Sequence, residues 1–416
     1  MTAELPITRT DAFAKRLQKR YAAERRFKMA GLAAVLFSVA VLLFLLVTMS
    51  INGIGGFQRA ELAVTVDFPE AGISADAQAM QLPTATQTLE AQGLAEVVAY
   101  FAETQLGADG AAELNSDAWR EVAVAIQENP AILREKVTFN LPASASLASG
   151  LSDEGSSEVQ ALADRLESDG LLAKHFDTGF LQRSDATDPQ QAGIWGALKG
   201  SILTMIVTLL LAFPIGVLAA LYLEEYAPKN RWTDLIEVSI NNLAAVPSII
   251  FGLLGLAVFL WVFPNYRSAP LIGGMTLALM TMPVIVISGR NAIKAVPPSI
   301  RDGALAIGAS PVQVVFHHVL PLALPGILTG TIIGMARALG ETAPLLMIGM
   351  RAFVATPPDG FTSPATVLPV QIFLWSDEID RGFVERTSAA IIVLLLFLLL
   401  MNGIAIYLRN KFEKTW

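Results

Sequence analysis

Six long apolar runs constrain this chain more than any other feature of its sequence. Each is about 18 to 29 residues long, and about 20 helical residues span a bilayer core. Backbone polar groups in lipid must be satisfied within the segment, so these runs predict membrane-spanning helices. They are residues 29–49, 198–223, 238–263, 271–288, 320–348 and 388–407.

The composition agrees with a membrane protein and excludes several kinds of site. Of the 416 residues, 53% are hydrophobic and 16% are charged. The chain has no cysteine, which excludes disulfides, zinc–thiolate sites and thiol nucleophiles. Its three histidines, His175, His317 and His318, are too few and too poorly spaced for a metal cluster. We therefore expect no metal and no cofactor, and without a basic patch interleaved with aromatics we expect no nucleic-acid partner.

Charge is segregated along the chain, and this predicts the orientation of the spans. Residues 1–28 hold about 8 basic and about 3 acidic groups, whereas residues 51–190 hold about 7 basic and about 22 acidic groups. The positive-inside rule places the basic tail 1–28 in the cytoplasm, together with loops that carry Lys229, Arg290 and Lys411. Both termini, including the tail 409–416, are therefore expected on the cytoplasmic side of the inner membrane.

Residues 51–192, after a first span at 29–50, never sustain a membrane-length apolar run. They predict a soluble insert on the outer side of the membrane. Alternation predicts a strand over residues 61–67, and helical spacing predicts helices over residues 117–127 and 157–172. The expected fold is thus an all-α polytopic membrane protein with six transmembrane helices and a small soluble α+β extracytoplasmic insert. The acidic surplus of the insert indicates a solvated surface more than a cation site, and its role stays open.

A short polar segment, residues 299–308, precedes the fifth apolar run. Ser299 follows two prolines and can act as N-cap, with Asp302 at the capping-box position. Gly308 suits the end of this helix, and Ser310 with Gln313 repeats the start signal. Two short helices that meet at a glycine bend are therefore expected.

The surface of this short helix suits a partner protein. Gly303 has no Cβ and Ala304 is small, so another surface could approach the helix closely. The alternative interpretation is an ordinary well-capped loop between two spans.

The fifth apolar run, residues 320–348, carries a stripe of small residues and two charges. Gly326, Gly330 and Gly334 recur at spacings of four, so a neighbouring helix could pack there at close backbone contact. Arg337 and Glu341 lie one helical turn apart and could pair. Charges at membrane depth face protein or water, which leaves a substrate pathway and a structural ion pair as two interpretations.

Prolines interrupt or begin several apolar runs. Such breaks persist in membranes only where protein or a water-filled cavity satisfies the freed backbone groups. This favours a pathway-forming bundle over a simple anchor. The prolines are Pro214, Pro247, Pro283, Pro325 and Pro344.

The short polar segment resembles a signature of one transporter class. The permease subunits of ABC importers carry the pattern Glu-Ala-Ala, three residues, Gly, nine residues, Ile-x-Leu-Pro. Here Arg301 is followed by Asp302, Gly303 and Ala304, and Gly308 and Leu320-Pro321 keep the spacing. Aspartate replaces the glutamate, glycine the first alanine, and His318 the isoleucine.

A second segment narrows the resemblance. The residues from Arg337 to Pro344, which read RALGETAP, are similar to a segment of PstA-type permeases of phosphate-specific ABC importers. Gly200-Ser201, the run YLEEY at 222–226 and PSI at 247–249 also resemble that family. The resemblance covers residues 193–416 and implies a type I ABC importer permease core at 193–408 with five transmembrane helices. The insert is longer than the common form of this subunit.

The resemblance implies a conduit that imports inorganic phosphate and is not itself an enzyme. No G-x-x-x-x-G-K-[ST] loop is present, so ATP hydrolysis is expected in a partner. The implied partners are a homodimer of ATP-binding subunits, a second permease subunit and a periplasmic phosphate-binding protein. Two alternatives stay open, a permease for another oxyanion or small solute, and a membrane sensor whose insert binds a ligand.

The resemblance also assigns roles to residues. The segment 299–308 would be the coupling helix that docks on the ATPase. Arg337 would offer donors to phosphate oxygens, and Glu341 would hold Arg337 when the path is empty. The residues expected to couple to the ATPase are Arg301, Asp302, Gly303, Ala304 and Gly308.

Overall fold

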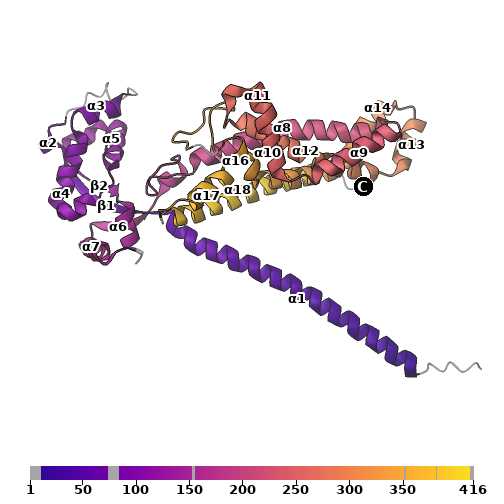
Figure 1. Ribbon diagram of the computed structural model, residues 1–416, viewed down its shortest axis with the longest axis horizontal. Coiled ribbons are helices and arrows are strands. Elements are labelled where there is room, and N and C mark those ends of the chain that lie inside the picture. Colours follow the sequence, from indigo (N-terminus) through magenta and orange to yellow (C-terminus); the bar gives the residue numbers. More distant parts are fainter. Residues whose placement is uncertain (1–10, 74–83, 152–154, 351–352, 381, 413–416) are drawn as a thin grey trace, which may run out of the picture. The chain divides into compact units, whose positions relative to one another are not determined.

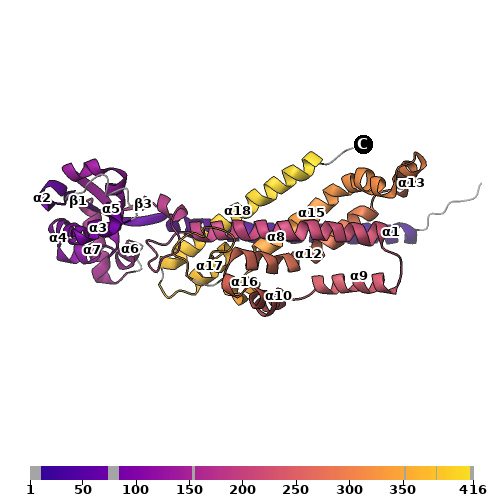
Figure 2. The same cartoon turned by 90° about the horizontal axis from the view of Figure 1, so that it is seen from above.

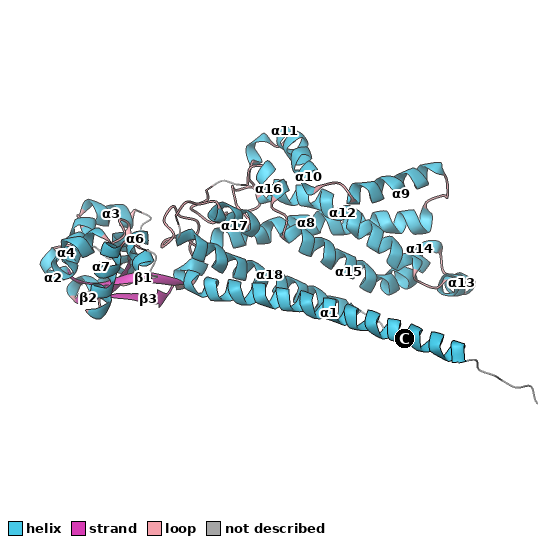
Figure 3. Cartoon of the chain, turned by 60° about the horizontal axis from the view of Figure 1, so that its bottom comes forward, coloured by secondary structure: helices cyan, strands magenta, loops and turns pink. Residues whose placement is uncertain are grey.

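The computed structural model describes residues 11–73, 84–151, 155–350, 353–380 and 382–412. The described residues are mostly helical, and their single three-stranded sheet lies in the insert, as the magenta strands of Figure 3 show. The predicted fold class, an all-α polytopic protein with a small α+β insert, is confirmed. The outer parts of the two tails, residues 1–10 and 413–416, lie outside the described residues.

The first helix is longer than the sequence predicted. Helix α1 (Asp11–Gly56) includes the basic segment before the apolar run, and it continues beyond residue 50 to Gly56. The glycines at its end serve close packing. A Cβ added to Gly56 would lie 2.8 Å from Cβ of Ala389 and would collide with the backbone of Glu385.

The sheet of the insert is antiparallel with strand order β2-β1-β3. The central strand β1 (Gln58–Asp67) contains the predicted strand, and β2 (Lys136–Pro142) and β3 (Leu172–Phe176) flank it. Leu62, Val64 and Val66 alternate along β1 and are buried, as expected for a strand with one covered face. The pairing of β1 with β3 stops at Leu62, opposite the start of β3 at Leu172. Farther along β1, the Gln105 side chain bonds to its backbone, donating to Thr65 O at 2.7 Å and accepting from Thr65 N at 3.0 Å.

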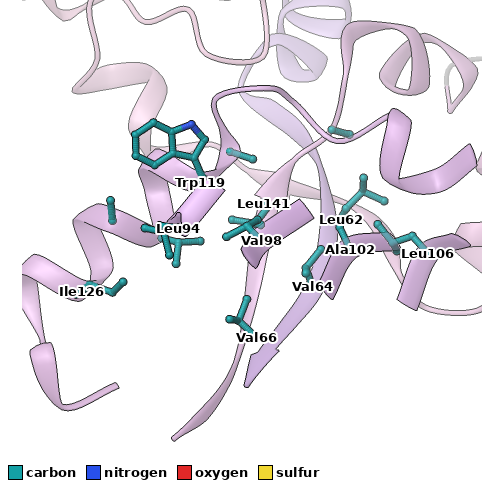
Figure 4. Close-up of a cluster of buried hydrophobic side chains, with 14 of the residues drawn as sticks. Leu62, Val64, Val66, Leu94, Val98, Ala102, Leu106, Trp119, Ile126 and Leu141 are labelled. Carbon is teal, nitrogen blue, oxygen red and sulfur yellow. The ribbon is translucent and has the colours of Figure 1, made fainter. Parts of the chain in front are cut away.

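Helices cover the buried face of this sheet. The larger ones are α4 (Leu94–Ala112), α5 (Ala118–Glu128) and α7 (Ser157–Ser168). Figure 4 shows apolar side chains of α4 and α5 meeting those of β1 and β2. The predicted helix over 157–172 ends early because Leu172 begins β3. The short helices are α2 (Phe68–Ala71), α3 (Ala85–Ala91), α6 (Ala145–Gly150) and the 3-10 turns η2 (Pro130–Arg134) and η3 (Thr178–Leu181).

Four long helices form the helical bundle, residues 195–412. They are α8 (Trp195–Leu221), α12 (Pro270–Lys294), α15 (Leu320–Leu339) and α18 (Gly382–Phe412). Helix α12 packs against both α8 and α15, as Figures 1 and 2 show. Small residues permit this, because a Cβ on Gly289 of α12 would lie 2.9 Å from Cβ of Ala220 on α8.

The predicted span over residues 238–263, which Pro247 was expected to interrupt, is a bent pair of helices. The structure has α9 (Arg231–Ala244) and a second helical stretch, Ser248–Val262, which meet at 104°. Pro247 lies at the break and has no N–H to donate, so the helix cannot continue regularly through it. Among the described residues, five helices are long and apolar enough to cross a membrane, or six if this bent pair is one span.

The remaining elements are short. The second half of the bent pair consists of α10 (Ser248–Leu254), the π-helical turn η5 (Gly255–Phe259) and α11 (Leu260–Val262). Two further π-helical turns, η4 (Tyr222–Tyr226) and η7 (Val314–Val319), follow α8 and precede α15. The others are η6 (Pro264–Tyr266), α13 (Pro298–Ala306), α14 (Pro311–Gln313), α16 (Ala343–Met347) and α17 (Leu368–Ser376).

Candidate functional site

Helix α13 is the short polar helix that the sequence predicted, with a different start. It begins at Pro298 with Pro297 as N-cap, and no side chain caps it, so the prediction of a Ser299 cap with Asp302 is wrong. Proline at the first helical position supplies the required φ and lacks an N–H that would be unsatisfied there. Pro298 thus removes one of the N–H groups that a capping side chain could otherwise satisfy.

The end of α13 follows the sequence signals. Gly308 has φ of +89°, and the N–H groups of Gly308 and Ala309 bond to Leu305 O and Ala304 O at 3.0 and 3.1 Å. This is a Schellman arrangement, which favours glycine at the left-handed position. The predicted restart is confirmed, because Ser310 and Gln313 form a capping box at the start of α14.

One face of α13 is exposed and partly apolar. Ile307 is 83% exposed, and Leu305 and the following Val312 are also exposed. A Cβ on Gly303 would meet no atom within 4 Å, so the described chain leaves that side open. Ala304 faces the other way and is buried among the apolar side chains that also include Val315. This helix therefore combines a seated face with an open one.

Arg301 of α13 points inward. Its guanidinium contacts Glu225 in η4, with Nη2 2.7 Å from Oε1 and Nε 3.1 Å from the same oxygen. It also donates to the carbonyls of Val296 at 2.7 Å and Ile293 at 3.0 Å. The sequence placed Arg301 among the partner-contacting residues and missed Glu225, although Glu225 lies in the singled-out run YLEEY.

A second ionic group holds neighbouring elements together. Arg290 near the end of α12 contacts Glu237 of α9 at 2.8 Å and Glu224 of η4 at 3.4 Å. Lys294 also lies 3.6 Å from Glu224. The two adjacent glutamates of η4 thus have different partners, Glu224 on α12 and Glu225 on α13.

The Arg337–Glu341 pair lies at a helix end instead of within a long helix. Helix α15 stops at Leu339, with Gly340 as C-cap, so the predicted helix over 320–348 is wrong in its last third. Arg337 Nε lies 3.3 Å from Glu341 Oε1, and the two side chains are 46% and 20% exposed. Part of this guanidinium is therefore open for a further contact in the isolated chain.

The glycine stripe of α15 faces α12. A Cβ on Gly326 would lie 2.6 Å from Cβ of Ala292, and one on Gly334 would lie 2.8 Å from Thr281 Cγ2. A Cβ on Gly330 would collide with the side chain of Ser288. Close approach of these two helices accounts for the three glycines.

A buried arginine that the sequence did not single out lies where the insert joins the bundle. Arg386 of α18 is 2% exposed and donates to Pro189 O at 2.7 Å, to Gly56 O at 2.8 Å and to Asp177 Oδ2 at 3.1 Å. Asp177 also contacts Arg183 at 2.6 Å. We call Arg386, Asp177 and Arg183 the insert junction.

The described histidines do not combine with these charged groups to form a metal site. Among the residues that the structure describes, no group of three or more His, Asp or Glu side chains could hold a metal ion. His317 and His318 instead border a cavity of about 660 Å³ beside α13, which is mainly lined by apolar residues.

Comparison with known proteins divides the chain in two. Residues 197–414 match the family described as binding-protein-dependent transport system inner membrane component. Residues 14–161 match a domain of unknown function, DUF3333. The first match contains the bundle, and the second contains most of the insert.

Individual proteins are similar over the bundle. The phosphate transport system permease protein PstA of Haemophilus influenzae is 31% identical over 234 residues, which cover 56% of this chain and 80% of that protein. The probable ABC transporter permease protein YqgI of Bacillus subtilis is 35% identical over 170 residues, 41% of this chain and only 56% of that protein. An inward facing structure of the MetNI methionine ABC transporter matches with 18% identity and a TM-score of 0.42, covering 53% of this chain and 95% of that one.

Proposed function

Because the chain belongs to the family of binding-protein-dependent transport system inner membrane components, we propose that it is the permease subunit of an ATP-driven importer of inorganic phosphate. The observation that carries this proposal is the similarity to PstA proteins over the bundle, 31% identity across 80% of the Haemophilus influenzae protein. The segments that resembled PstA in sequence lie in the bundle, YLEEY at 222–226 in η4 and RALGETAP at 337–344 from the end of α15 to the start of α16.

The proposed partners are two copies of an ATP-binding subunit, a second permease subunit and a periplasmic phosphate-binding protein. This chain would supply half of the transmembrane path. In this proposal both termini and α13 lie on the cytoplasmic side, where Lys229, Arg290 and Lys294 provide the positive charge expected of inner loops. The insert then lies on the periplasmic side.

Helix α13 is the proposed docking element for the ATPase. Its open face, with Gly303, Leu305 and Ile307, supplies apolar area that a cleft could bury, and Asp302 is exposed beside it. Its seated face rests on η7, so a displacement of α13 would reach α15 directly. Closure of the ATPase pair on ATP would then shift the bundle between inward-open and outward-open packings.

Arg337 is the proposed contact for phosphate in the path. A guanidinium offers planar, permanently charged donors that match phosphate oxygens. The part of Arg337 that Glu341 leaves exposed can make such a contact, and Glu341 can hold the guanidinium when the path is empty.

Growth of a bacterial strain that lacks its own phosphate permease tests this proposal. Expression of this chain with its ATPase, second permease and binding protein should restore growth at low phosphate and uptake of radioactive phosphate. Rescue of a sulfate-uptake or molybdate-uptake strain in place of the phosphate strain would identify another oxyanion as the substrate. Absence of any rescue, with the complex assembled in the membrane, would contradict the proposal.

A further inference from the structure

Arg301 uses its guanidinium entirely within the chain. Its shortest hydrogen bonds to Glu225, Val296 and Ile293 are 2.7, 2.7 and 3.0 Å long. The side chain is 23% exposed and that of Glu225 is 11% exposed. A docked ATPase would therefore find Arg301 engaged, unlike its neighbour Asp302, which is exposed.

These bonds join three elements through one side chain. Ile293 lies in the last turn of α12, Val296 lies in the link to α13, and Glu225 lies in the π-helical turn that extends α8. A planar guanidinium can serve carbonyl and carboxylate acceptors at the same time, which a lysine could not do with the same geometry. Arg301 thus ties the start of α13 to the ends of α8 and α12.

Within the described residues, Arg301 makes all the side-chain hydrogen bonds that α13 forms with other elements. The most extensive packing of α13 against another element is apolar and is made with η7, which precedes α15. A displacement of α13 can therefore reach α15 through this packing, α12 through the link 295–297 and the bonds of Arg301 to Val296 and Ile293, and α8 through the charged contact with Glu225.

The two glutamates of η4 contact different elements of the bundle. Successive helical residues point about 100° apart, so Glu224 and Glu225 face different neighbours. Glu224 contacts Arg290 and Lys294 of α12, which is packed along α8 over its length. Glu225 alone contacts the short helix, by way of Arg301. Glu224 thus braces the bundle internally, whereas Glu225 links it to α13.

We propose that Glu225 is a positioning residue for energy coupling, and that its ion pair with Arg301 transmits the displacement of α13 to α8. This inference rests on the proposed function, in which an ATPase moves α13. Charge-assisted hydrogen bonds are short and directional, so this pair can act as a stiff link while its partial exposure lets it reform after each cycle. Without the pair, ATP hydrolysis continues, but α13 loses its direct contact with the end of α8 and less of its displacement reaches that helix.

The test is the number of phosphate ions imported per ATP hydrolysed, measured on the complete complex in proteoliposomes. E225Q keeps the side-chain size and removes the charge, and it should lower this ratio about tenfold or more, the loss expected for a charge-assisted hydrogen bond. ATPase turnover and complex assembly should stay within about twofold of the parent, since the docking face is untouched.

E224Q is the matched control. It changes the adjacent glutamate by the same atoms, and Arg290 keeps Glu237 at 2.8 Å, so the ratio should not change. An unchanged ratio in E225Q would overturn the proposal. A loss of assembly or of ATPase activity in E225Q, in proportion to the loss of import, would also overturn it, because the pair would then be merely structural.

A second measurement separates this inference from the choice of substrate. The chain has no cysteine, so cysteines introduced at Ile307 and Leu218, both exposed, can carry spin labels without further changes. In the full chain in lipid nanodiscs, the label distance should have a narrow distribution with Glu225 and a broad one in E225Q. Equal distributions in the two forms would overturn the proposal that the Glu225–Arg301 pair links α13 to α8, whether or not phosphate is the solute. Failure of the parent complex to import phosphate, with a narrow distribution, would count against the proposed function alone.

Discussion

Two arginines, Arg301 and Arg386, each join several elements of this chain, and they do so in different surroundings. Arg301 is 23% exposed and has Glu225 as a carboxylate partner that no other described cation contacts. Arg386 is 2% exposed, shares Asp177 with Arg183 and satisfies its other donors on the carbonyls of Gly56 and Pro189. It also lies over the ring of Phe180 at 5.2 Å.

This difference in burial distinguishes the contacts of Arg386, which stay formed, from the Arg301–Glu225 contact, which can shift. Removing the partner of a buried charge is costly, so the insert junction must stay assembled throughout any transport cycle. Water can reach the partly exposed Arg301–Glu225 pair as an alternative partner, so breaking it costs less than breaking the buried contact of Arg386. We therefore expect the insert to stay attached to the start of α18, whereas the contact between α13 and α8 can shift.

The largest expected effect is on the insert junction. R386Q should lower the free energy of unfolding by about 3–5 kcal/mol, because Asp177 and two carbonyls lose their buried donor. Equilibrium unfolding of the purified chain, followed by tryptophan fluorescence, measures this change. Trp375 contributes to that signal and is buried, with its ring centroid 6.3 Å from that of Phe180. R183Q is the control and should cost less, because Arg183 is 31% exposed and Asp177 keeps Arg386. Equal losses in R386Q and R183Q would show that burial does not decide the cost of removing an arginine from the insert junction.

Arg337 gives the next largest effect and adds a third arginine to the comparison. R337Q should lower phosphate import roughly tenfold or more, because charged hydrogen bonds are worth about 1.5–3 kcal/mol. Assembly and unfolding should change little, since Arg337 is 46% exposed. Uptake into proteoliposomes checks this, with R409Q at the far end of α18 as the control. A variant that assembles and imports at the full rate would leave Arg337 with a structural role only.

A packing variant tests whether a loosened bundle has the same effect on transport as loss of the Arg301–Glu225 pair. G330L should destabilise the chain by about 1–3 kcal/mol, because any Cβ at this position collides with Ser288. G403L in α18 is the control, since a Cβ there meets no atom within 4 Å. Import and ATP hydrolysis should fall together in G330L. A selective loss of phosphate import per ATP in G330L would show that this ratio is not specific to the Arg301–Glu225 pair.

The smallest effect is a pH dependence near the insert junction. Burial raises the pKa of Asp185 above its ordinary value of 3.8, against the hydrogen bond that Trp375 donates to it at 2.9 Å. The folded chain thus holds this proton more tightly than the unfolded chain, so stability falls as pH rises through the raised pKa. D185N should be slightly more stable than the parent at pH 7 and equal to it below pH 3.8.

Unfolding of both forms at several pH values measures that difference. A parent that gains stability over D185N as the pH rises would mean that the ionised carboxylate is favoured in the fold. The environment of Asp185 would then be wetter than its position beside the buried Trp375 implies.

Local sequence signals predicted the elements better than their bends and ends. Hydropathy located the spans, alternation located β1, and the positive φ of Gly308 and the Ser310 capping box followed from residue type. The proline itself indicated a break at Pro247, but hydropathy does not register direction, so the angle of 104° between the two helices was not predicted. The end of α15 at Leu339 was also missed, because the run after it stays apolar around Pro344.

Pairs that are far apart in sequence could not be predicted. Glu225 and Arg301 are separated by 76 residues, and Arg386 and Asp177 by 209 residues. Each side chain by itself resembles an ordinary charge near a span end, and only the packing of α8 against α12 and of the insert onto α18 brings the partners together. The short strands β2 and β3 were missed for the same reason, since their pairing with β1 defines them.

The most direct test of the whole account is a crosslink from the open face of α13. In the cysteine-free chain, I307C carrying a short photoactivatable crosslinker should form a product with the ATPase subunit in the assembled complex. In a separate experiment, the unlabelled I307C should resist a membrane-impermeant thiol reagent added to intact cells. A residue on α13 that reacts with that reagent from outside, or that forms no product with the ATPase, would contradict the account.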